Sequence, residues 1–428
     1  MILTFLMTLG MMALLGGNDH RALADVIART RFVDVHAHPV VGHVLYKEGD
    51  FYPVLEPPLR RPFWAVPRDR IAVFDTMEPR ALRAIYGYAK DDVRENDLPA
   101  LRLLSEAFWK NGNQAAFDKV MDLCGIERVF DNTDSLPKDI NPARVFWVPF
   151  ADELFCPLDP AGLTGVSPDF KLDLADYAKD AAALITKHGE VVKDLPSWLA
   201  LVNKVLEGYK RDGAVAIKVV CAYRRSLWFD DPPESEAASL FLRGLKGRLT
   251  TWEEHKKIQD FIARHIFLKA GTLGLPVHFH TGFGANAGLK SLDANPLNLE
   301  SVCSDYRFKD TTFLILHAGY PAWDHVKALL EKRNVFVEFS AVNWFVYEKE
   351  LTDILYGWLT YPGASEKILF GSDAGAPVFF WIAAENSRRA LYGALSRLIN
   401  EGILDEAKAV RIARNIMRDN ALRIHGGR

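Results

Sequence analysis

The chain alternates short apolar runs with longer stretches in which apolar residues recur at helical spacing. Apolar runs bounded by turn residues are typical of strands buried on both faces. Eight such runs are predicted strands: residues 32–35, 127–130, 144–149, 214–220, 276–279, 312–316, 335–339 and 367–370. The predicted helices cover residues 19–29, 115–123, 252–273, 323–332, 347–356, 381–399 and 405–422. This alternation indicates repeated strand–helix units that build a parallel sheet.

Eight strands with crossovers and a helical tail predict an α/β fold, a distorted (β/α)8 TIM barrel. A doubly wound open sheet is the alternative, but it should place its ligands at one switch point instead of on several strands. A proline- and aromatic-rich insertion at 40–80 follows the first strand. With the helical pieces behind it, we expect a helical cap inserted after strand 1, over about residues 40–125. A second insertion, 222–248, is expected to be a lid loop, or else a packing or oligomer surface.

We expect residues 25–428 to form this one barrel and residues 1–24 to be an apolar N-terminal extension. The extension resembles a signal-peptide core, but Lys and Arg are absent ahead of its apolar run. The run is also shorter than the ~20 residues that a membrane-spanning helix needs. It is therefore a poor signal peptide, a buried helix or an over-extended start. We expect a cytoplasmic protein, with export as the alternative if the first ~20 residues are a signal peptide.

Composition and net charge limit the classes of molecule that the chain is expected to bind. The formal net charge is -3 and charged residues make up 25% of the chain, so nothing favours binding to nucleic acid or to an anionic membrane. The four cysteines lack C-x-x-C spacing, which suits reduced thiols better than a disulfide framework or a zinc knuckle. Cys221 follows an apolar run and could line a site, although a buried structural thiol is the favoured interpretation.

Polar residues gather where the predicted strands end. His36 and His38 follow the first strand, His280 and His317 follow the fifth and sixth, and Asp373 follows the eighth. An α/β barrel keeps its chemistry at the carboxyl ends of its strands. Imidazoles and a carboxylate converging there form a ligand set for one divalent metal ion, with zinc the leading candidate and manganese the alternative.

The spacing suggests a role for each residue. His36 and His38 lie two apart on a strand, so both imidazoles can share one metal. His280, next to the turn, is the better ligand of its pair, whereas His278 is a substrate-pocket residue or a satisfied core histidine. His317 is a fourth ligand, a general acid or a group that polarises a substrate oxygen. Asp373 can bind the metal and take the proton of metal-bound water, which makes it catalytic as well as a ligand.

Charged residues near the fourth strand indicate an anionic substrate. Lys218 lies inside an apolar strand, where an unpaired charge is costly. It binds an anion, is carbamylated between two metals, or pairs with a barrel carboxylate, for which Glu338 is a candidate. Tyr223 and Arg224 follow the strand, and an arginine suits a substrate carboxylate, so Lys218 and Arg224 together suggest an acidic substrate. Asp34 is either a group that orients an imidazole or a structural hydrogen-bonding group.

These motifs resemble the amidohydrolase superfamily, in particular its amidohydrolase-2 branch, which includes aminocarboxymuconate-semialdehyde and resorcylate decarboxylases. The motifs that carry the resemblance are residues 33–38 (V-D-V-H-A-H), 280–284 (H-T-G-F-G), 317–321 (H-A-G-Y-P) and 370–373 (F-G-S-D). Within the branch, residues 218–224, the H-T-G-F-G turn and Asn295-Pro296 resemble the domain fused to glutamine synthetase in nodulin-like proteins. The resemblance implies a metal-dependent (β/α)8 barrel with His36, His38, His280 and Asp373 as ligands and His317 as the catalytic histidine.

The sequence thus predicts a mononuclear metal-dependent hydrolase that cleaves an amide-type C–N bond of a small carboxylate-bearing substrate by metal-bound hydroxide. Lys218, Tyr223, Arg224 and His278 are the expected substrate-binding residues. A non-oxidative decarboxylase with the same metal site is the first alternative, and a catalytically silent, partner-binding barrel is the second. The expected partner is a small anionic molecule, and a homo-oligomer is compatible with the pattern.

Overall fold

The computed structural model describes residues 20–41, 44–45, 72–138, 140–166, 168–284 and 289–426 of the chain. Contacts divide the chain into two compact units. The first comprises Met1–Trp147, Leu316–Leu330 and Phe336–Arg428, and the second comprises Val148–Ile315 and Glu331–Val335. Each unit is described by itself below.

Parallel strands form the centre of the first unit. β1 (Phe32–Ala37) pairs in parallel with β4 (Ile126–Asn132), and β5 (Val145–Val148) follows β4 in the sheet. β9 (Val335–Glu338) pairs in parallel with β10 (Ile368–Leu369). The Val35 amide donates to the Phe370 carbonyl at 3.1 Å, so the chain leaving β10 lies directly beside β1. All six residues of β1 are buried, as expected for a strand covered on both faces.

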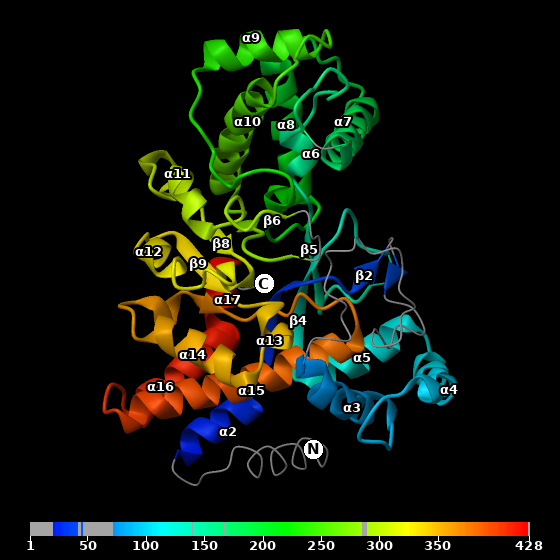
Figure 1. Ribbon diagram of the computed structural model, residues 1–428, viewed down its shortest axis with the longest axis vertical. Helices are drawn as coiled ribbons and strands as arrows, with labels where there is room; N and C mark the ends of the chain where they lie inside the picture. The colour runs from blue at the N-terminus through cyan, green and yellow to red at the C-terminus, as the bar shows by residue number, and fades with distance from the viewer. Residues whose placement is uncertain are drawn as a thin grey trace. The chain divides into compact units, whose positions relative to one another are not determined.

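Helices cover this sheet. α15 packs against α14, α13, α5 and α3, and α2 packs against α16 (Figure 1). The helices of the first unit are α2 (Arg21–Arg29), α3 (Ala72–Tyr86), α4 (Leu98–Trp109), α5 (Asn113–Cys124), α12 (Val326–Leu330), α13 (Val342–Phe345), α14 (Glu348–Leu359), α15 (Pro377–Asn400), α16 (Glu406–Arg414) and α17 (Asn420–Ile424). A short antiparallel pair, β2 (Val40–Val41) and β3 (Val44–Leu45), follows β1. Along the sequence, helices α3, α4 and α5 therefore lie between β1 and β4, where we expected the helical insertion.

The second unit has its own parallel sheet, in the order β6 (Ile217–Val219), β7 (Val277–Phe279), β8 (Phe313–Ile315). α10 packs against α6, α8 and α9. The helices are α6 (Asp152–Phe155), α7 (Pro168–His188), α8 (Leu195–Arg211), α9 (Glu234–Gly244), α10 (Trp252–Leu273) and α11 (Glu300–Cys303). α8 begins at a capping box in which Asp194 and Ser197 satisfy each other's amides, and α10 ends at Gly274, whose φ of 60° suits glycine.

All eight predicted strands are confirmed, most of them shortened by a residue or more. The helix predicted over 405–422 instead comprises α16, a π-helical turn (Asn415–Asp419) and α17. The prediction of a loop over 222–248 was wrong in part, because α9 begins directly after Pro233 with Glu234 and Glu236 in its first turn. Proline and acidic residues favour a helix start as well as a loop. The proline-rich stretch 46–71 lies outside the described residues.

Two further properties bear on the sequence predictions. Among the described residues, every helix is too short or too polar to cross a membrane. The Cys221 side chain is buried, and this burial raises the pKa of its thiol to about 12. A structural role for Cys221 fits this environment better than a reactive one.

Acid should destabilise the fold through His425. Burial against Phe130 lowers the pKa of this histidine to about 4, so the ring is neutral in the fold. In the unfolded chain it is protonated below about pH 6.5, so stability falls as the pH drops from there towards about 4. Between about pH 7.5 and about pH 4.5, we expect the unfolding free energy of the wild type to fall by about 2–3 kcal/mol more than that of His425→Phe. Equal losses in urea titrations of the two proteins would contradict this.

Candidate metal centre

Three polar side chains of the first unit converge on one point. The Nε2 atoms of His36 and His38 lie 3.1 Å and 3.2 Å from Oδ1 of Asp373. Their ligand atoms all lie within 4.8 Å of one another, and this is the one such group among the described residues. His36 is buried, whereas the side chains of His38 and Asp373 are 36% and 23% exposed. The cluster is therefore closed on one side and accessible on the other.

The backbone of β1 positions Asp373. The carbonyl of His36 accepts hydrogen bonds from the amides of Ser372 at 3.1 Å and Asp373 at 2.7 Å. Two residues further on, the His38 amide donates to the Ala374 carbonyl at 2.9 Å. The segment after β10 is thus fixed to the end of β1, which brings the carboxylate against both imidazoles.

Buried side chains hold the same segment from other directions. Asp34 accepts a hydrogen bond from the Ser372 amide at 2.8 Å, so it is the structural group that the sequence offered as one of two options. From α13, Asn343 donates to the Gly371 carbonyl at 2.7 Å and Trp344 donates to the Ser372 carbonyl at 2.8 Å. Burial raises the pKa of Asp34 to about 8.

A backbone carbonyl fixes the ring of His38. Its Nδ1 lies 3.2 Å from the carbonyl oxygen of Asn132 at the end of β4. Because a carbonyl only accepts, Nδ1 carries the hydrogen, and the neutral ring presents its lone pair at Nε2. Metal-binding histidines commonly have this arrangement, which sets both the tautomer and the ring orientation.

The cluster fits a divalent metal ion. In a tetrahedral zinc site with bonds of about 2.0–2.1 Å, neighbouring ligand atoms lie about 3.3 Å apart. The separations of 3.1 and 3.2 Å from Asp373 Oδ1 to the two Nε2 atoms match this spacing. Burial alone would raise the pKa of Asp373, but the nearby His317 and the hydrogen bond from His36 outweigh it and hold the pKa well below its usual value. The carboxylate is therefore ionised, as a ligand must be.

His317 lies beside the cluster, with its ring centroid 5.2 Å from that of His36. Its Nδ1 lies 2.9 Å from Oγ of Ser340, and this hydroxyl donates to Oε1 of Glu338 at 2.7 Å. A hydroxyl has one hydrogen, so Ser340 must accept from Nδ1–H of His317. The ring is thereby oriented with Nε2 as its remaining reactive atom.

Glu338 is fully buried and organises this neighbourhood. Besides Ser340, it accepts the His317 amide at 2.7 Å. Burial raises the pKa of Glu338 to about 7. A side chain at Gly371 would collide with the Glu338 carboxylate, which explains glycine at that position. These contacts of Glu338 orient His317. The suggested pairing of Glu338 with Lys218 stays a prediction.

Backbone strain is concentrated in these loops. Among the described non-glycine residues, φ is positive at His317 (61°), Ala318 (57°), Ala341 (59°) and Asp373 (55°). All four follow the carboxyl ends of strands β8, β9 or β10. Left-handed conformations cost non-glycine residues free energy and are often found at functional sites. The left-handed backbone at His317 and Asp373 sets the directions of these two side chains.

The other predicted site residues belong to the second unit. Lys218 on β6 and His278 on β7 are directly paired and buried, so their side chains lie on the same face of that sheet. The rings of Tyr223 and His280 are in contact, with centroids 4.3 Å apart and planes tilted by 34°. Arg224 already has an internal partner, since its Nε lies 3.2 Å from Oδ2 of Asp173 and its guanidinium lies over the Tyr177 ring.

Some residues of the two neighbourhoods escaped the sequence analysis. Ser340 and Asp152 each follow a predicted strand, so the strand-end rule that found the histidines could have found them. Asp152 is buried, accepts the Val220 amide with both oxygens at 3.1 and 2.9 Å, and has a pKa raised by burial to about 6. The contributions of Asn132 and Asn343 had no such signal, because a backbone carbonyl and an amide on a short helix leave no pattern.

Comparison with solved structures identifies the fold. The chain is similar to uronate isomerase from Thermotoga maritima, with 12% identity, 96% and 99% of the two chains covered and a TM-score of 0.70. It is also similar to glucuronate isomerase from Caulobacter crescentus (13% identity, 96% of each chain, TM-score 0.66). A proposed metal-dependent hydrolase from Lactobacillus casei ATCC 334 matches with 16% identity over 94% and 97% of the chains and a TM-score of 0.63. Together with the parallel sheets, this likeness confirms the (β/α)8 barrel.

Sequence comparison identifies the family. Among proteins with curated descriptions, none matches this chain. The family profile described as amidohydrolase matches residues 209–426, just over half of the chain. This family uses a divalent metal ion, which agrees with the ligand set formed by His36, His38 and Asp373. The chain therefore belongs to the amidohydrolase family of metal-dependent enzymes.

Proposed function

We propose that this protein is a metal-dependent hydrolase that cleaves an amide-type C–N bond in a small, carboxylate-bearing substrate. The observation that carries the proposal is the convergence of His36, His38 and Asp373, whose ligand atoms lie within 4.8 Å of one another. A hydrolase needs an activated water and a group that manages protons beside it. The accessible side of the cluster leaves room for both.

The metal would be held by His36, His38 and Asp373, with His280 as a fourth proposed ligand on the sequence pattern. We propose zinc, with manganese as the alternative, because both accept imidazole and carboxylate donors. When bound, such an ion lowers the pKa of water and polarises a carbonyl oxygen.

His317 would be the proton-transfer group. Ser340 engages its Nδ1 at 2.9 Å, so a proton moves on or off the ring at Nε2. The ring lies against His36, next to the cluster. In this position Nε2 can hydrogen-bond a developing oxyanion or donate to the departing amine. Glu338 and Ser340 act through His317 as positioning residues.

The substrate-binding residues remain proposals on the sequence pattern. Lys218, Tyr223, Arg224 and His278 would hold a substrate carboxylate, because Lys218 and His278 lie on strands of the barrel and Tyr223 and Arg224 follow one. The salt bridge between Arg224 and Asp173 would then have to open or be shared. A cytoplasmic location, a homo-oligomeric state and an anionic substrate belong to the same proposal.

Metal content should depend on the cluster. We expect elemental analysis of the purified wild type to find about one divalent ion per chain. His38→Ala and Asp373→Ala should lose most of it, since each removes a ligand. His325→Ala, which alters an exposed histidine outside the cluster, is the matched control and should retain the metal. A wild type without metal, or a His38→Ala variant that keeps it, would contradict the proposed centre.

Ser340 should matter through the orientation of His317. We expect Ser340→Ala to lower kcat about 10–100-fold with the metal content unchanged, the range typical of residues that support site histidines. Ser340→Thr keeps the hydroxyl and should restore most of the activity. Ser396→Ala is the control, because the Ser396 hydroxyl is buried without a hydrogen-bond partner among the described residues. A Ser340→Ala enzyme as active as the wild type would contradict the positioning role.

The reaction itself can be tested by following both products. We expect the metal-loaded enzyme to release an amine from N-acyl amino acids or γ-glutamyl amides. His317→Asn should lower this rate by about 10²–10⁴-fold without loss of metal, as removal of a general acid does. Release of CO₂ from carboxylated aromatics without an amine would instead identify a decarboxylase. No turnover by metal-loaded protein in either assay would favour a silent, partner-binding barrel.

A further inference from the structure

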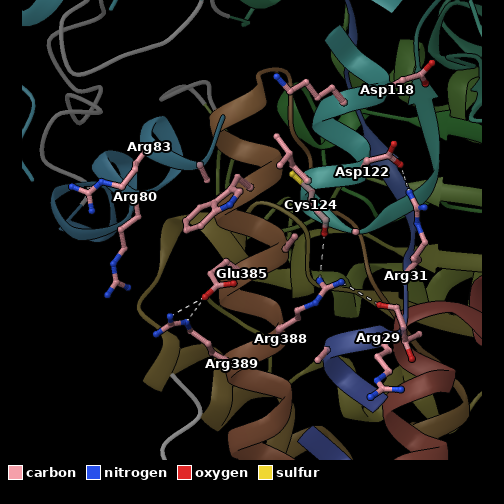
Figure 2. Close-up of a pocket in the computed structure, with 18 of the residues that line it drawn as sticks. Arg29, Arg31, Arg80, Arg83, Asp118, Asp122, Cys124, Glu385, Arg388 and Arg389 are labelled. Carbon is pink, nitrogen blue, oxygen red and sulfur yellow. Dashed lines mark hydrogen bonds and ion pairs between the residues drawn. The ribbon is translucent and has the colours of Figure 1, made fainter. Parts of the chain in front are cut away.

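A cavity of about 1010 Å³ lies in the first unit, away from the metal cluster. Its walls come from the end of α2, from α3, from α5 and from α15 (Figure 2). Arg31 and Gly125, which line it, directly precede β1 and β4. His36 and His38 lie at the other end of β1, so the cavity and the cluster occupy opposite ends of the same strand.

Positive charge dominates the lining. Arg80 and Arg83 come from α3, and Arg388 and Arg389 come from α15 (Figure 2). Arg29 is the last residue of α2, and Arg31 lies in the connector before β1. With Lys119, the lining has seven cationic side chains against three acidic ones, Asp118, Asp122 and Glu385. Arg83 pairs with Asp91, outside the lining, at 2.6 Å. The cavity still carries an excess of positive charge.

The acidic residues are already engaged. Asp122 pairs with Arg31 at 2.7 Å and with Arg144 at 2.6 Å. Glu385 pairs with Arg389 at 2.8 Å. Asp118 accepts a hydrogen bond from Gln114 at 3.1 Å, and its carboxylate lies 3.6 Å from Arg144. These carboxylates therefore do not neutralise the remaining cations of the lining.

Three cations have no carboxylate partner among the described residues. Arg29 makes no hydrogen bond or ion pair there, and Arg80 contacts only the sulfur of Met77, at 3.9 Å. The Lys119 ammonium lies over the Phe108 ring, 4.6 Å from its centroid. All three side chains are exposed, and no carboxylate of the described residues offsets their charges.

Arg388 adds a buried positive charge. Its side chain is 6% exposed and donates to two backbone carbonyls, of Thr30 at 3.1 Å and of Cys124 at 3.5 Å. The guanidinium also lies over the Phe32 ring, 4.3 Å from its centroid. Neutral carbonyls orient a guanidinium but do not cancel its charge, so a fixed positive potential remains at the base of the cavity.

The rest of the lining is small and apolar apart from one aromatic residue. Trp381 is the aromatic side chain of the described lining, and it is accompanied by alanines and a leucine: Ala28, Ala84, Ala115, Leu123 and Ala384. Small residues leave the volume open, and an indole offers a flat face for another ring. A ligand that combines an anionic group with a planar ring would complement both parts of the lining.

We propose that this cavity is a binding site for an organic phosphate of the nucleotide class, separate from the metal centre. A phosphate suits this cavity because one guanidinium group can donate two parallel hydrogen bonds to two phosphate oxygens, and several guanidinium groups line the cavity. The volume is at the upper end of the range for small-molecule sites, large enough for a phosphate together with a nucleoside. Because the cavity and the pair His36 and His38 lie at opposite ends of β1, a ligand bound here would occupy a site outside the metal centre.

The test is calorimetric titration of the metal-loaded full chain with AMP, with inorganic phosphate and adenosine as the two part-ligands. We expect saturable binding of AMP and at least about tenfold weaker binding of either part alone. Arg80→Glu should weaken AMP binding by about tenfold or more, since it reverses an uncompensated charge. Its folding should be intact, because Arg80 has no carboxylate partner to lose, and the melting temperature checks this.

Two controls distinguish binding in this cavity from non-specific charge attraction and from binding at the metal centre. Arg102→Glu makes the same charge change on an exposed position of α4 outside the cavity and should bind AMP as the wild type does. His38→Ala, in the metal cluster, should also bind AMP normally. No saturable AMP binding, equal weakening by Arg102→Glu, or loss of binding in His38→Ala would each overturn the proposal. Binding is measured without turnover, so its outcome does not depend on the proposed reaction.

Discussion

The hydrogen bonds between the end of β1 and the segment after β10 set the geometry on which the rest of the site depends. The His36 carbonyl accepts the amides of Ser372 and Asp373, and this double acceptance turns the Asp373 carboxylate towards His36 and His38. The turn requires a left-handed φ of 55° at Asp373, a conformation that costs an aspartate about 1–3 kcal/mol. Asp34 and the α13 side chains Asn343 and Trp344 hold the segment in place and offset this strain.

The same principle recurs at His317, which follows β8. A left-handed residue again follows a strand, and here the buried carboxylate of Glu338 accepts its amide directly, at 2.7 Å. The Ser340 hydroxyl, which is hydrogen-bonded to Glu338, fixes the orientation of the imidazole through its hydrogen bond with Nδ1. The metal ligands and the proposed proton-transfer group are therefore positioned by separate networks. A substitution in one network should leave the other largely intact, which makes metal binding and proton transfer separable by mutation.

Much of the fold followed from the sequence, because strands buried on both faces leave continuous apolar runs. The same runs located His36, His38, His317 and Asp373, since barrels carry their chemistry at strand ends. The orientation of these side chains did not follow. The tautomer of His38 depends on a backbone carbonyl of Asn132, which any residue at that position would supply. Tertiary partners were equally hidden: Arg224 looked available to a substrate, yet its partner Asp173 lies on α7, a helix that the sequence pattern did not predict. The cationic cavity was also missed, because its residues are scattered over four helices and a connector, and no local run of charge marks them.

His36, His38 and Asp373 should together bind one divalent metal ion. The most direct test is a crystal structure of the protein as purified, with anomalous diffraction data collected on both sides of the zinc and manganese absorption edges. We expect one anomalous peak within bonding distance of Nε2 of His36, Nε2 of His38 and Oδ1 of Asp373. A peak bound elsewhere, or well-ordered ligand side chains with no peak between them, would contradict it.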